Sequence, residues 1–171
     1  MRGLYFALAV VAIVAGSAQG ADNSVAAYLA KNKSLSLMNQ AMTDAGLVSL
    51  LSGKEPVTLL VPTDQALRKL PPAKLNALLH PANKNDLKTL MTYHIIRGRF
   101  SEASLRKSIR DANGWGGLTT VSGEKIGLTF QGYDLWLWDR SNIQTVITVP
   151  EHKQSNGVVY TIDKLMTPKP D

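Results

Sequence analysis

The stretch from Val57 to Leu70, which reads VTLLVPTDQALRKL, constrains the fold more than any other part of the chain. Val57 to Val61 is an uncharged run of β-branched and aliphatic residues, which predicts a strand buried on both faces. Pro62 ends this strand, because proline cannot donate a hydrogen bond to a neighbouring strand. The Thr63 hydroxyl can then cap a following helix, so we expect a core strand joined directly to a capped helix.

Helices are expected mainly in the first half of the chain. Apolar residues three and four positions apart predict helices that begin after Ser24, after Ser34, after Asn85 or Asp86, and after Ser101. From residue 114 onward the pattern changes to short β-like runs separated by glycine-containing turns. Strands are expected at 118–121, 125–130, 133–138, 143–149 and 157–162. This order predicts an α+β fold with a helical layer against an antiparallel sheet.

Residues 1–20 have the pattern of a secretory signal peptide. Arg2 precedes an apolar run over 4–14, and Ala18 and Gly20 precede a cleavage position before Ala21. A membrane anchor is the alternative, but this run is shorter than the roughly 20 residues that a span needs. We therefore expect a single domain over 21–171 in the periplasm or outside the cell, where it must be stable without disulfides because the chain has no cysteine.

The sequence lacks the motifs of the common enzyme and metal-site classes. It has no cysteine, no G-x-S-x-G turn, no H-E-x-x-H pair and no glycine-rich phosphate loop after a strand. Its histidines, His80, His94 and His152, are far apart in the sequence. We therefore expect no catalysis, no cofactor and no metal site.

The net charge of +6 is mild, and the basic residues are scattered along the chain. Nucleic-acid binding sites concentrate basic residues in patches, so we expect no nucleic-acid partner. At most, the charge predicts weak peripheral attraction to anionic lipid or polysaccharide. We expect a monomer.

Three ordered segments resemble the conserved blocks of the fasciclin domain family. They are 58–67 (TLLVPTDQAL), the pair Tyr93-His94, and 156–168 (NGVVYTIDKLMTP). The resemblance implies helices wedged against an antiparallel β-sandwich, and an extracellular role in adhesion or partner binding. It also implies a structural role for the signature residues Thr58, Pro62, Thr63, Asn156, Gly157 and Asp163.

The pair Tyr93-His94 is the first candidate site. In the fasciclin family this pair is associated with adhesion, so the resemblance implies that both residues take part in partner binding. The spacing of Leu87, Leu90, Met91 and His94 places the histidine on a buried helix face, where we expect it to be hydrogen-bonded near Thr63 or Asp163. Tyr93, one position round the helix, is expected to reach the surface.

The tryptophans are the second candidate site. In the strand expected over 133–138, Leu135 and Leu137 point to one face while Trp136 and Trp138 point to the other. Either a helix or a sheet covers the tryptophans, or they form an exposed patch for a partner, a sugar or a flat hydrophobic ligand. Trp115 either extends that patch or fills its own glycine-rich loop.

Together these patterns predict a secreted or periplasmic binding or adhesion module whose partner is a protein or polysaccharide at the cell surface. The alternative is a carrier of a flat lipophilic ligand, either carotenoid-like or a lipid, that uses the aromatic strand. A carrier would need a cleft lined by Trp136 or Trp138.

Overall fold

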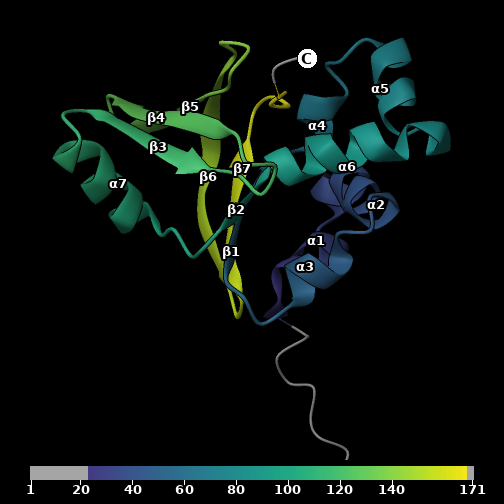
Figure 1. Cartoon of the computed structure of the whole chain (residues 1–171), viewed down its shortest axis with the longest axis horizontal. Coiled ribbons are helices and arrows are strands. Elements are labelled where there is room, and N and C mark those ends of the chain that lie inside the picture. Colours follow the sequence, from purple (N-terminus) through teal and green to yellow (C-terminus); the bar gives the residue numbers. More distant parts are fainter. Residues whose placement is uncertain (1–22, 169–171) are drawn as a thin grey trace, which may run out of the picture.

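The computed structural model describes residues 23–168, which form a helical layer beside a bent sheet (Figure 1). The expected signal peptide lies outside these residues. The helices are α1 (Val25–Lys31), α2 (Ser36–Asp44), α3 (Val48–Ser52), α4 (Asp64–Leu67), α5 (Pro72–Leu78), α6 (Lys84–Tyr93) and α7 (Glu102–Asp111), with short 3₁₀ helices η2 (Lys33–Leu35) and η3 (Pro81–Asn83). The strands are β1 (Val57–Pro62), β2 (Ile95–Arg97), β3 (Trp115–Thr119), β4 (Lys125–Gln131), β5 (Asp134–Trp138), β6 (Gln144–Gln154) and β7 (Gly157–Ile162). None of the helices in residues 23–168 is long and apolar enough to cross a membrane.

The seven strands form a sheet in the order β2-β1-β7-β6-β5-β4-β3. Strand β6 joins its two halves, because its start pairs with β5 and its remainder pairs with β7, with irregular register between Ile147 and His152. Figure 1 shows β3, β4 and β5 running across the upper end of the steep strands β1, β6 and β7. The α+β fold class is confirmed. The expected antiparallel meander is corrected in one respect, since β1 comes from the helical half and pairs with β7 in parallel.

Two hydrophobic cores lie on opposite faces of β1. Val57, Leu59 and Val61 pack with the helical layer, in a cluster that includes residues of α1, α2, α3 and α6. Leu60 belongs to the second cluster, which also contains residues of α7 and of strands β3 to β5. Every residue of β1 is buried, as expected for a strand enclosed on both faces.

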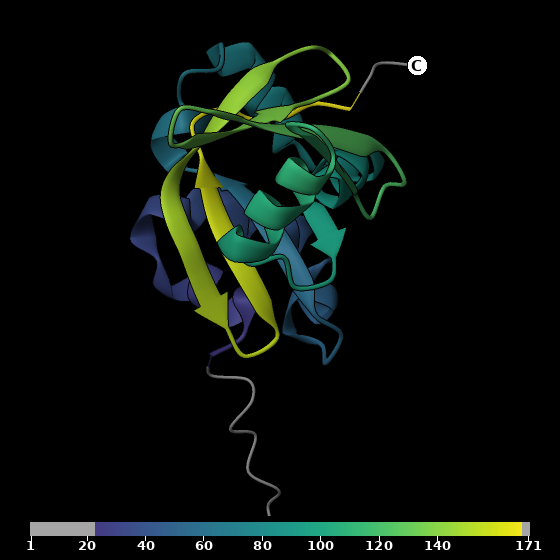
Figure 2. The same ribbon diagram turned by 90° about the vertical axis from the view of Figure 1, so that its left-hand side faces the viewer.

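Helix α7 closes the second core from the side opposite the main helical layer. It packs on β3 and β4 through Leu105 and Ile109, and Gly116 leaves room for this contact because a Cβ there would lie 3.0 Å from Ile109 Cγ1. Figure 2, seen from that side, shows α7 lying in front of the strands.

Three of the expected helix caps are confirmed and two are wrong. The side chains of Ser24, Thr63 and Ser101 accept hydrogen bonds from the first turns of α1, α4 and α7. Ser34 caps no helix, because α2 begins at Ser36 and is capped by Asp64 from another element. Helix α6 begins at Lys84, before the residues expected to cap it.

Candidate binding site

The signature residues Thr58 and Asn156 join distant parts of the chain by hydrogen bonds. The Thr58 hydroxyl donates to the Gly98 carbonyl at 2.8 Å and accepts from the Phe100 amide at 2.9 Å, which fixes the connection from β2 to α7. Asn156 is almost fully buried and bonds to the start of α1, to Leu51 in the last turn of α3, and to Gly53 just after that helix. These contacts are structural and leave no free reactive group.

Pro62, Thr63, Gly157 and Asp163 hold the ends of the two central strands. Pro62 is the last residue of β1, and Thr63 caps α4 with an Oγ1 that accepts from Ala66. Gly157 pairs with Val57 at the start of β7. Beyond the end of β7, the Asp163 carboxylate accepts from the Thr145 hydroxyl at 2.7 Å and from the Val146 amide at 2.9 Å, both on β6.

His94 is completely buried at the end of α6, as its helical spacing predicts. Its Nδ1 lies 2.9 Å from the Leu90 carbonyl and must donate, so its Nε2 is the acceptor for the Met166 amide at 3.3 Å. The bonding partners are therefore Leu90 and Met166 instead of groups near Thr63 or Asp163. Burial lowers the pKa of His94 to about 4, which keeps the ring neutral at pH 7.

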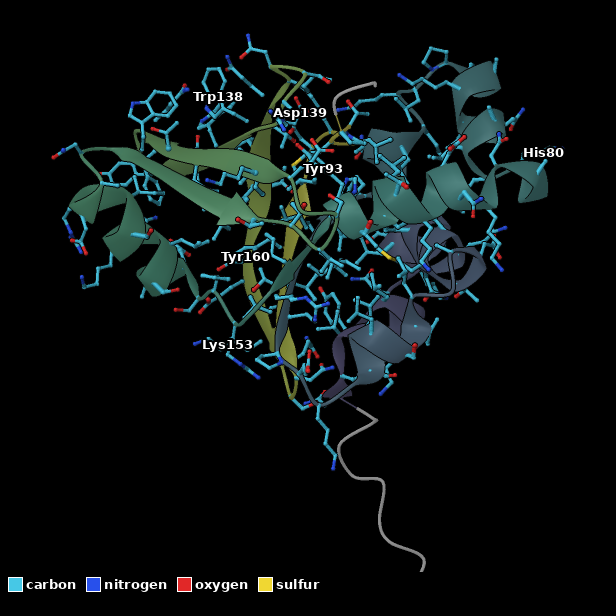
Figure 3. All side chains as sticks on the ribbon, in the orientation of Figure 1. His80, Tyr93, Trp138, Asp139, Lys153 and Tyr160 are labelled. Atoms are coloured by element: carbon cyan, nitrogen blue, oxygen red, sulfur yellow. The ribbon has the colours of Figure 1, made fainter. Side chains whose placement is uncertain are left out.

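The expectation that Tyr93 reaches the surface is wrong. Its side chain is completely buried in the second core, and its hydroxyl accepts a hydrogen bond from the Arg140 amide at 3.3 Å (Figure 3). Burial raises the pKa of Tyr93 to about 12. Nearby, the buried Asp139 accepts from the Ile143 and Thr167 amides. Tyr93, His94 and Asp139 thus fix the β5–β6 turn and the segment after β7, and none of the three is accessible to a partner.

The structure brings the three tryptophans together on one face of the sheet. Strand pairing sets Trp115 beside Thr129, and Thr129 beside Trp136, so these side chains share a face. Trp138 lies two residues after Trp136 on β5 and therefore belongs to the same face. The rings of Trp115 and Trp138 lie 5.8 Å apart between centroids. Trp115 is 59% exposed, whereas Trp136 and Trp138 are half-buried. Trp115 therefore extends the patch formed by Trp136 and Trp138. Figure 1 shows the helices of the main layer to the right of the steep strands, away from β3, β4 and β5.

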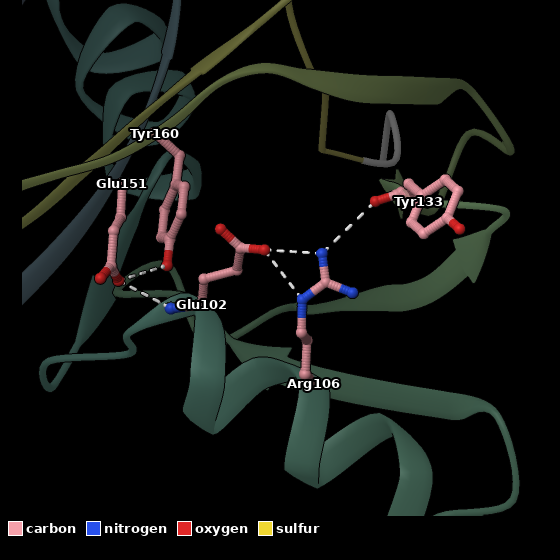
Figure 4. A network of polar contacts seen from close by, with 5 residues as sticks. All are labelled: Glu102, Arg106, Tyr133, Glu151 and Tyr160. Atoms are coloured by element: carbon pink, nitrogen blue, oxygen red, sulfur yellow. Dashed lines mark hydrogen bonds and ion pairs between the residues drawn. The ribbon is translucent and has the colours of Figure 1, made fainter.

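A polar pocket of about 250 Å³ lies between the start of α7 and strands β5 and β6. Its inner wall is Tyr160, whose hydroxyl donates to the Phe100 carbonyl at 2.8 Å and lies 3.4 Å from Glu151 Oε2 (Figure 4). The same Glu151 oxygen accepts from the Glu102 amide, at the first turn of α7, at 2.7 Å. Nothing in the sequence signals this network, because its residues come from three separated segments.

The charges of this pocket are largely satisfied within the protein. Burial would raise the pKa of Glu151, but the Glu102 amide and the Lys153 ammonium outweigh it and lower that pKa. Burial and the nearby Glu151 carboxylate raise the pKa of Tyr160, so its hydroxyl stays protonated. Arg106 pairs with Glu102 at 2.6 Å and lies over the Phe130 ring at 4.3 Å. Glu102, Arg106, Glu151 and Tyr160 therefore all have partners within the protein.

Exposed aromatic side chains are concentrated on one part of the molecule, which we call the aromatic lobe and define as α7 and strands β3 to β5 with their turns. Trp115 belongs to β3, and Tyr133, in the β4–β5 turn, is 93% exposed. Among the side chains that the structure describes, the other large exposed hydrophobic residue is Val48, on α3. Within the same residues no cluster of His, Cys, Asp or Glu is arranged to hold a metal ion.

Comparison with known sequences gives one family. The sequence model of the Fasciclin domain matches residues 33–168. The chain is 31% identical over 157 residues to Protein sll1483 of Synechocystis, covering 92% of this chain and 80% of that protein. It is also 32% identical over 139 residues to Stabilin-1 of the mouse, covering 77% of this chain but only 5% of that much longer protein.

Comparison with solved structures gives the same fold. The structure is similar to a FAS1 domain pair from the insect cell adhesion molecule Fasciclin I, with a TM-score of 0.77 and 15% sequence identity. The match covers 86% of this chain and 51% of the other, so this chain spans about half of the pair.

Proposed function

Because this chain belongs to the fasciclin domain family, we propose that it is a non-catalytic adhesion module that acts outside the cytoplasm and attaches to a macromolecule at the cell surface through its aromatic lobe. The observation that carries this proposal is the position of Trp115 and Tyr133, which are exposed on one lobe of a protein whose other large apolar side chains in residues 23–168 are mostly buried. Aromatic side chains are enriched at interaction sites relative to the rest of a protein surface.

Two further observations support a binding role. At the pocket beside α7, Glu151 and Tyr160 are hydrogen-bonded within the protein, and the residues of the Tyr93-His94 pair have structural partners. Fasciclin I, whose domains share this fold, is a cell adhesion molecule. The proposed location outside the cytoplasm also rests on the signal-peptide pattern of residues 1–20.

The carrier alternative lacks a cavity in the expected place. The main pockets of the part of the chain that the structure describes have neither Trp136 nor Trp138 in their walls. The Nε1 atoms of both indoles are buried, and the Trp138 ring lies 5.8 Å from the Trp115 ring between centroids. We therefore retain attachment to a macromolecule as the function.

The proposal is tested by attachment of the purified protein, residues 21–171, to the surface of the cells that produce it. Fluorescently labelled wild type is compared with the double variant Trp115→Ala/Tyr133→Ala and with the control Val48→Ala, which removes exposed apolar surface from α3. We expect the double variant to lose attachment by about tenfold, as for exposed anchors at an interface, and the control to be unchanged. Equal attachment of all three proteins, each with wild-type circular dichroism, would refute the role of the aromatic lobe.

A further inference from the structure

The outer surface of the aromatic lobe is a sheet face, which we call the tryptophan face. Strand pairing defines it as two adjacent rows across β3, β4, β5 and β6. One row is Trp115, Thr129, Trp136 and Val146, and the other is Gly117, Gly127, Trp138 and Gln144. Leu118, Ile126, Leu128 and Leu137 point to the opposite face and are buried towards the second core. Figure 3 places Trp138 on the side of β4 and β5 away from α7.

Glycine leaves room for the indole rings on this face. Gly127 lies beside Trp138, where a Cβ would be 3.5 Å from Trp138 Cβ, and Gly117 is the next residue in the same row. The Trp138 ring can therefore extend along the sheet towards Trp115. Thr129 is only 8% exposed although it belongs to this outer face, which indicates that the indoles cover it. We call this surface the platform; its Trp115 and Trp138 rings lie 5.8 Å apart between centroids, with their planes inclined at 57° to each other.

The platform presents carbon to the solvent. The Nε1 atoms of Trp136 and Trp138 are buried and have no hydrogen-bond partner among the described residues. The half-exposed part of these side chains is therefore the apolar part of the indole. Such a surface binds by stacking, and it suits a ligand that has flat apolar faces of its own.

Basic side chains flank the Trp138 end of the platform. Lys125 pairs with Thr119 on the same face, two positions along β4 from Gly127. The Lys164 ammonium donates to the carbonyl of Gln144, the residue paired with Trp138, at 2.8 Å. Arg140 is exposed two residues after Trp138. None of these three cations is in an ion pair with the described residues.

Acidic groups are turned away from this end. Asp139 is buried, with its carboxylate bound to the Ile143 and Thr167 amides, and Glu124 Oε2 is buried as well. The carboxylate on the tryptophan face is that of Asp134, which lies beyond Trp136 at the opposite end of β5. The Trp138 end is therefore complementary in charge to an anionic partner.

We propose that the tryptophan face binds an anionic polysaccharide, with the apolar faces of sugar rings stacked on Trp115 and Trp138 and their carboxylate or sulfate groups near Lys125 and Lys164. A neutral sugar would leave these cations without a role. Lipid insertion favours apolar side chains that protrude, whereas Trp136 and Trp138 are half-buried and their Nε1 atoms are enclosed. Single-stranded nucleic acid also stacks on aromatic rings, but it requires a longer basic groove than these cations provide. The inference rests on the proposed adhesion function and names its partner.

The test is binding of the purified protein, residues 21–171, to defined polymers, followed by tryptophan fluorescence and calorimetry. The probes are dextran sulfate, polygalacturonate, neutral dextran, poly(dT) and vesicles of phosphatidylcholine with phosphatidylglycerol. We expect binding to dextran sulfate, to polygalacturonate or to both, which distinguishes sulfate from carboxylate recognition, and no binding to neutral dextran. The affinity should fall as salt rises, because exposed charges are screened.

Matched variants locate the site. Trp115→Ala, which removes an exposed ring, should weaken binding by about tenfold or more. Lys125→Gln/Lys164→Gln should weaken binding and also reduce its salt dependence. The controls are Val48→Ala, which removes exposed apolar surface from α3, outside the aromatic lobe, and Lys107→Gln, which removes an exposed cation from α7. Both controls should bind as wild type does.

Three results would overturn the inference. They are failure to bind either anionic polysaccharide, equal binding to neutral dextran, and full binding by Trp115→Ala. If the protein binds poly(dT) or vesicles but neither anionic polysaccharide, the partner is a nucleic acid or a membrane instead. If the aromatic variants lose cell attachment but the wild type binds no polysaccharide, only this inference fails. If cell attachment is insensitive to those variants, the proposed function fails instead.

Discussion

The Asn156 side chain joins segments that are far apart in the sequence. Its Oδ1 accepts from the Val25 amide at 2.9 Å, and its Nδ2 donates to the Leu51 and Gly53 carbonyls, each at 2.8 Å. Only an amide side chain both accepts and donates in this way at neutral pH without a charge, so aspartate cannot replace it. The sequence indicates the importance of Asn156 through its family resemblance, but its partners are set by the folded chain.

Gly157, the next residue, is predicted to tolerate no side chain. A Cβ at this position would overlap the Val57 carbonyl oxygen and lie 2.9 Å from Val25 Cγ2. The oxygen belongs to the paired strand β1 and cannot move without separating β1 from β7. Gly157→Ala should therefore lower the free energy of unfolding by more than about 3 kcal/mol, measured by urea denaturation.

Gly117→Ala is the matched control for that substitution. The nearest atom to its added Cβ is the Ile126 carbonyl oxygen at 3.7 Å, which is an ordinary contact. We expect its free energy of unfolding to change by less than about 1 kcal/mol. Similar losses in the two variants would show that the close approach of β1 and β7 is not what requires glycine.

Among the elements, helix α2 depends on a residue of α4 for its N-terminal cap. Its own N-cap residue, Leu35, makes no side-chain hydrogen bond. Instead, Asp64 Oδ1 accepts from the Leu37 amide at 3.0 Å, and Asp64 Oδ2 accepts from the Ser36 hydroxyl at 2.6 Å. An anion at this end of a helix is also favoured by the helix dipole. Asp64 therefore ties α4, and with it β1, to the helical layer.

Removal of this carboxylate should destabilise the protein measurably. We expect Asp64→Ala to lower the free energy of unfolding by about 1 to 2 kcal/mol, as for the loss of an N-cap, and Asp64→Asn to lose less because it keeps an acceptor. The measurement is chemical denaturation at pH 7. Asp44→Ala, at the opposite end of α2, is the control and should have no loss of stability, since an anion is unfavourable there. A loss in Asp44→Ala as large as that in Asp64→Ala would contradict the capping role.

The local patterns of the sequence predict the elements better than the contacts between them. Thr63 and Ser101 are recognisable as caps because each accepts a hydrogen bond from the backbone amide three residues later, in the helix that it begins. The cap of α2 is not recognisable, because Asp64 lies 28 positions from Ser36 in the sequence. Similarly, the spacing that includes His94 correctly predicts its burial, but its acceptor role towards Met166 depends on how the segment after β7 returns to α6.

For the whole molecule, the pairing of β1 with β7 decides the topology. These strands are parallel neighbours although Val57 and Gly157 are 100 residues apart, a distance at which hairpin signals carry no information. This pairing places helices on one face of the sheet and α7 on the other, which leaves the tryptophan face to the solvent. The alternation of Leu135 and Trp136 predicts two apolar faces, but only the topology determines which one is covered.

The stability of the whole molecule is predicted to fall below pH 6.5 because of His94. Burial lowers its pKa to about 4 in the folded protein, while the unfolded chain has the ordinary value of 6.5. Between these values the unfolded chain binds a proton that the folded protein does not, so acid favours unfolding. The stability contributed by neutral His94 is thus fully present above pH 6.5 and is lost as the pH falls towards 4. The pKa of Glu151 is lowered in the folded protein, so Glu151 adds a loss of stability only as the pH falls below 4.5, the ordinary pKa of a glutamate.

The comparison that isolates this effect is urea denaturation at pH 7.5 and pH 4.5. Linkage predicts that His94 alone accounts for roughly 2 to 3 kcal/mol of the loss in wild type. His94→Ala should be less stable at pH 7.5, because the Met166 amide loses its buried acceptor, but its further loss on acidification should be smaller by that amount. His80→Ala removes an exposed histidine and should follow the wild-type pH dependence. If wild type and His94→Ala lose equal stability between the two pH values, protonation of His94 does not limit the acid stability of the fold.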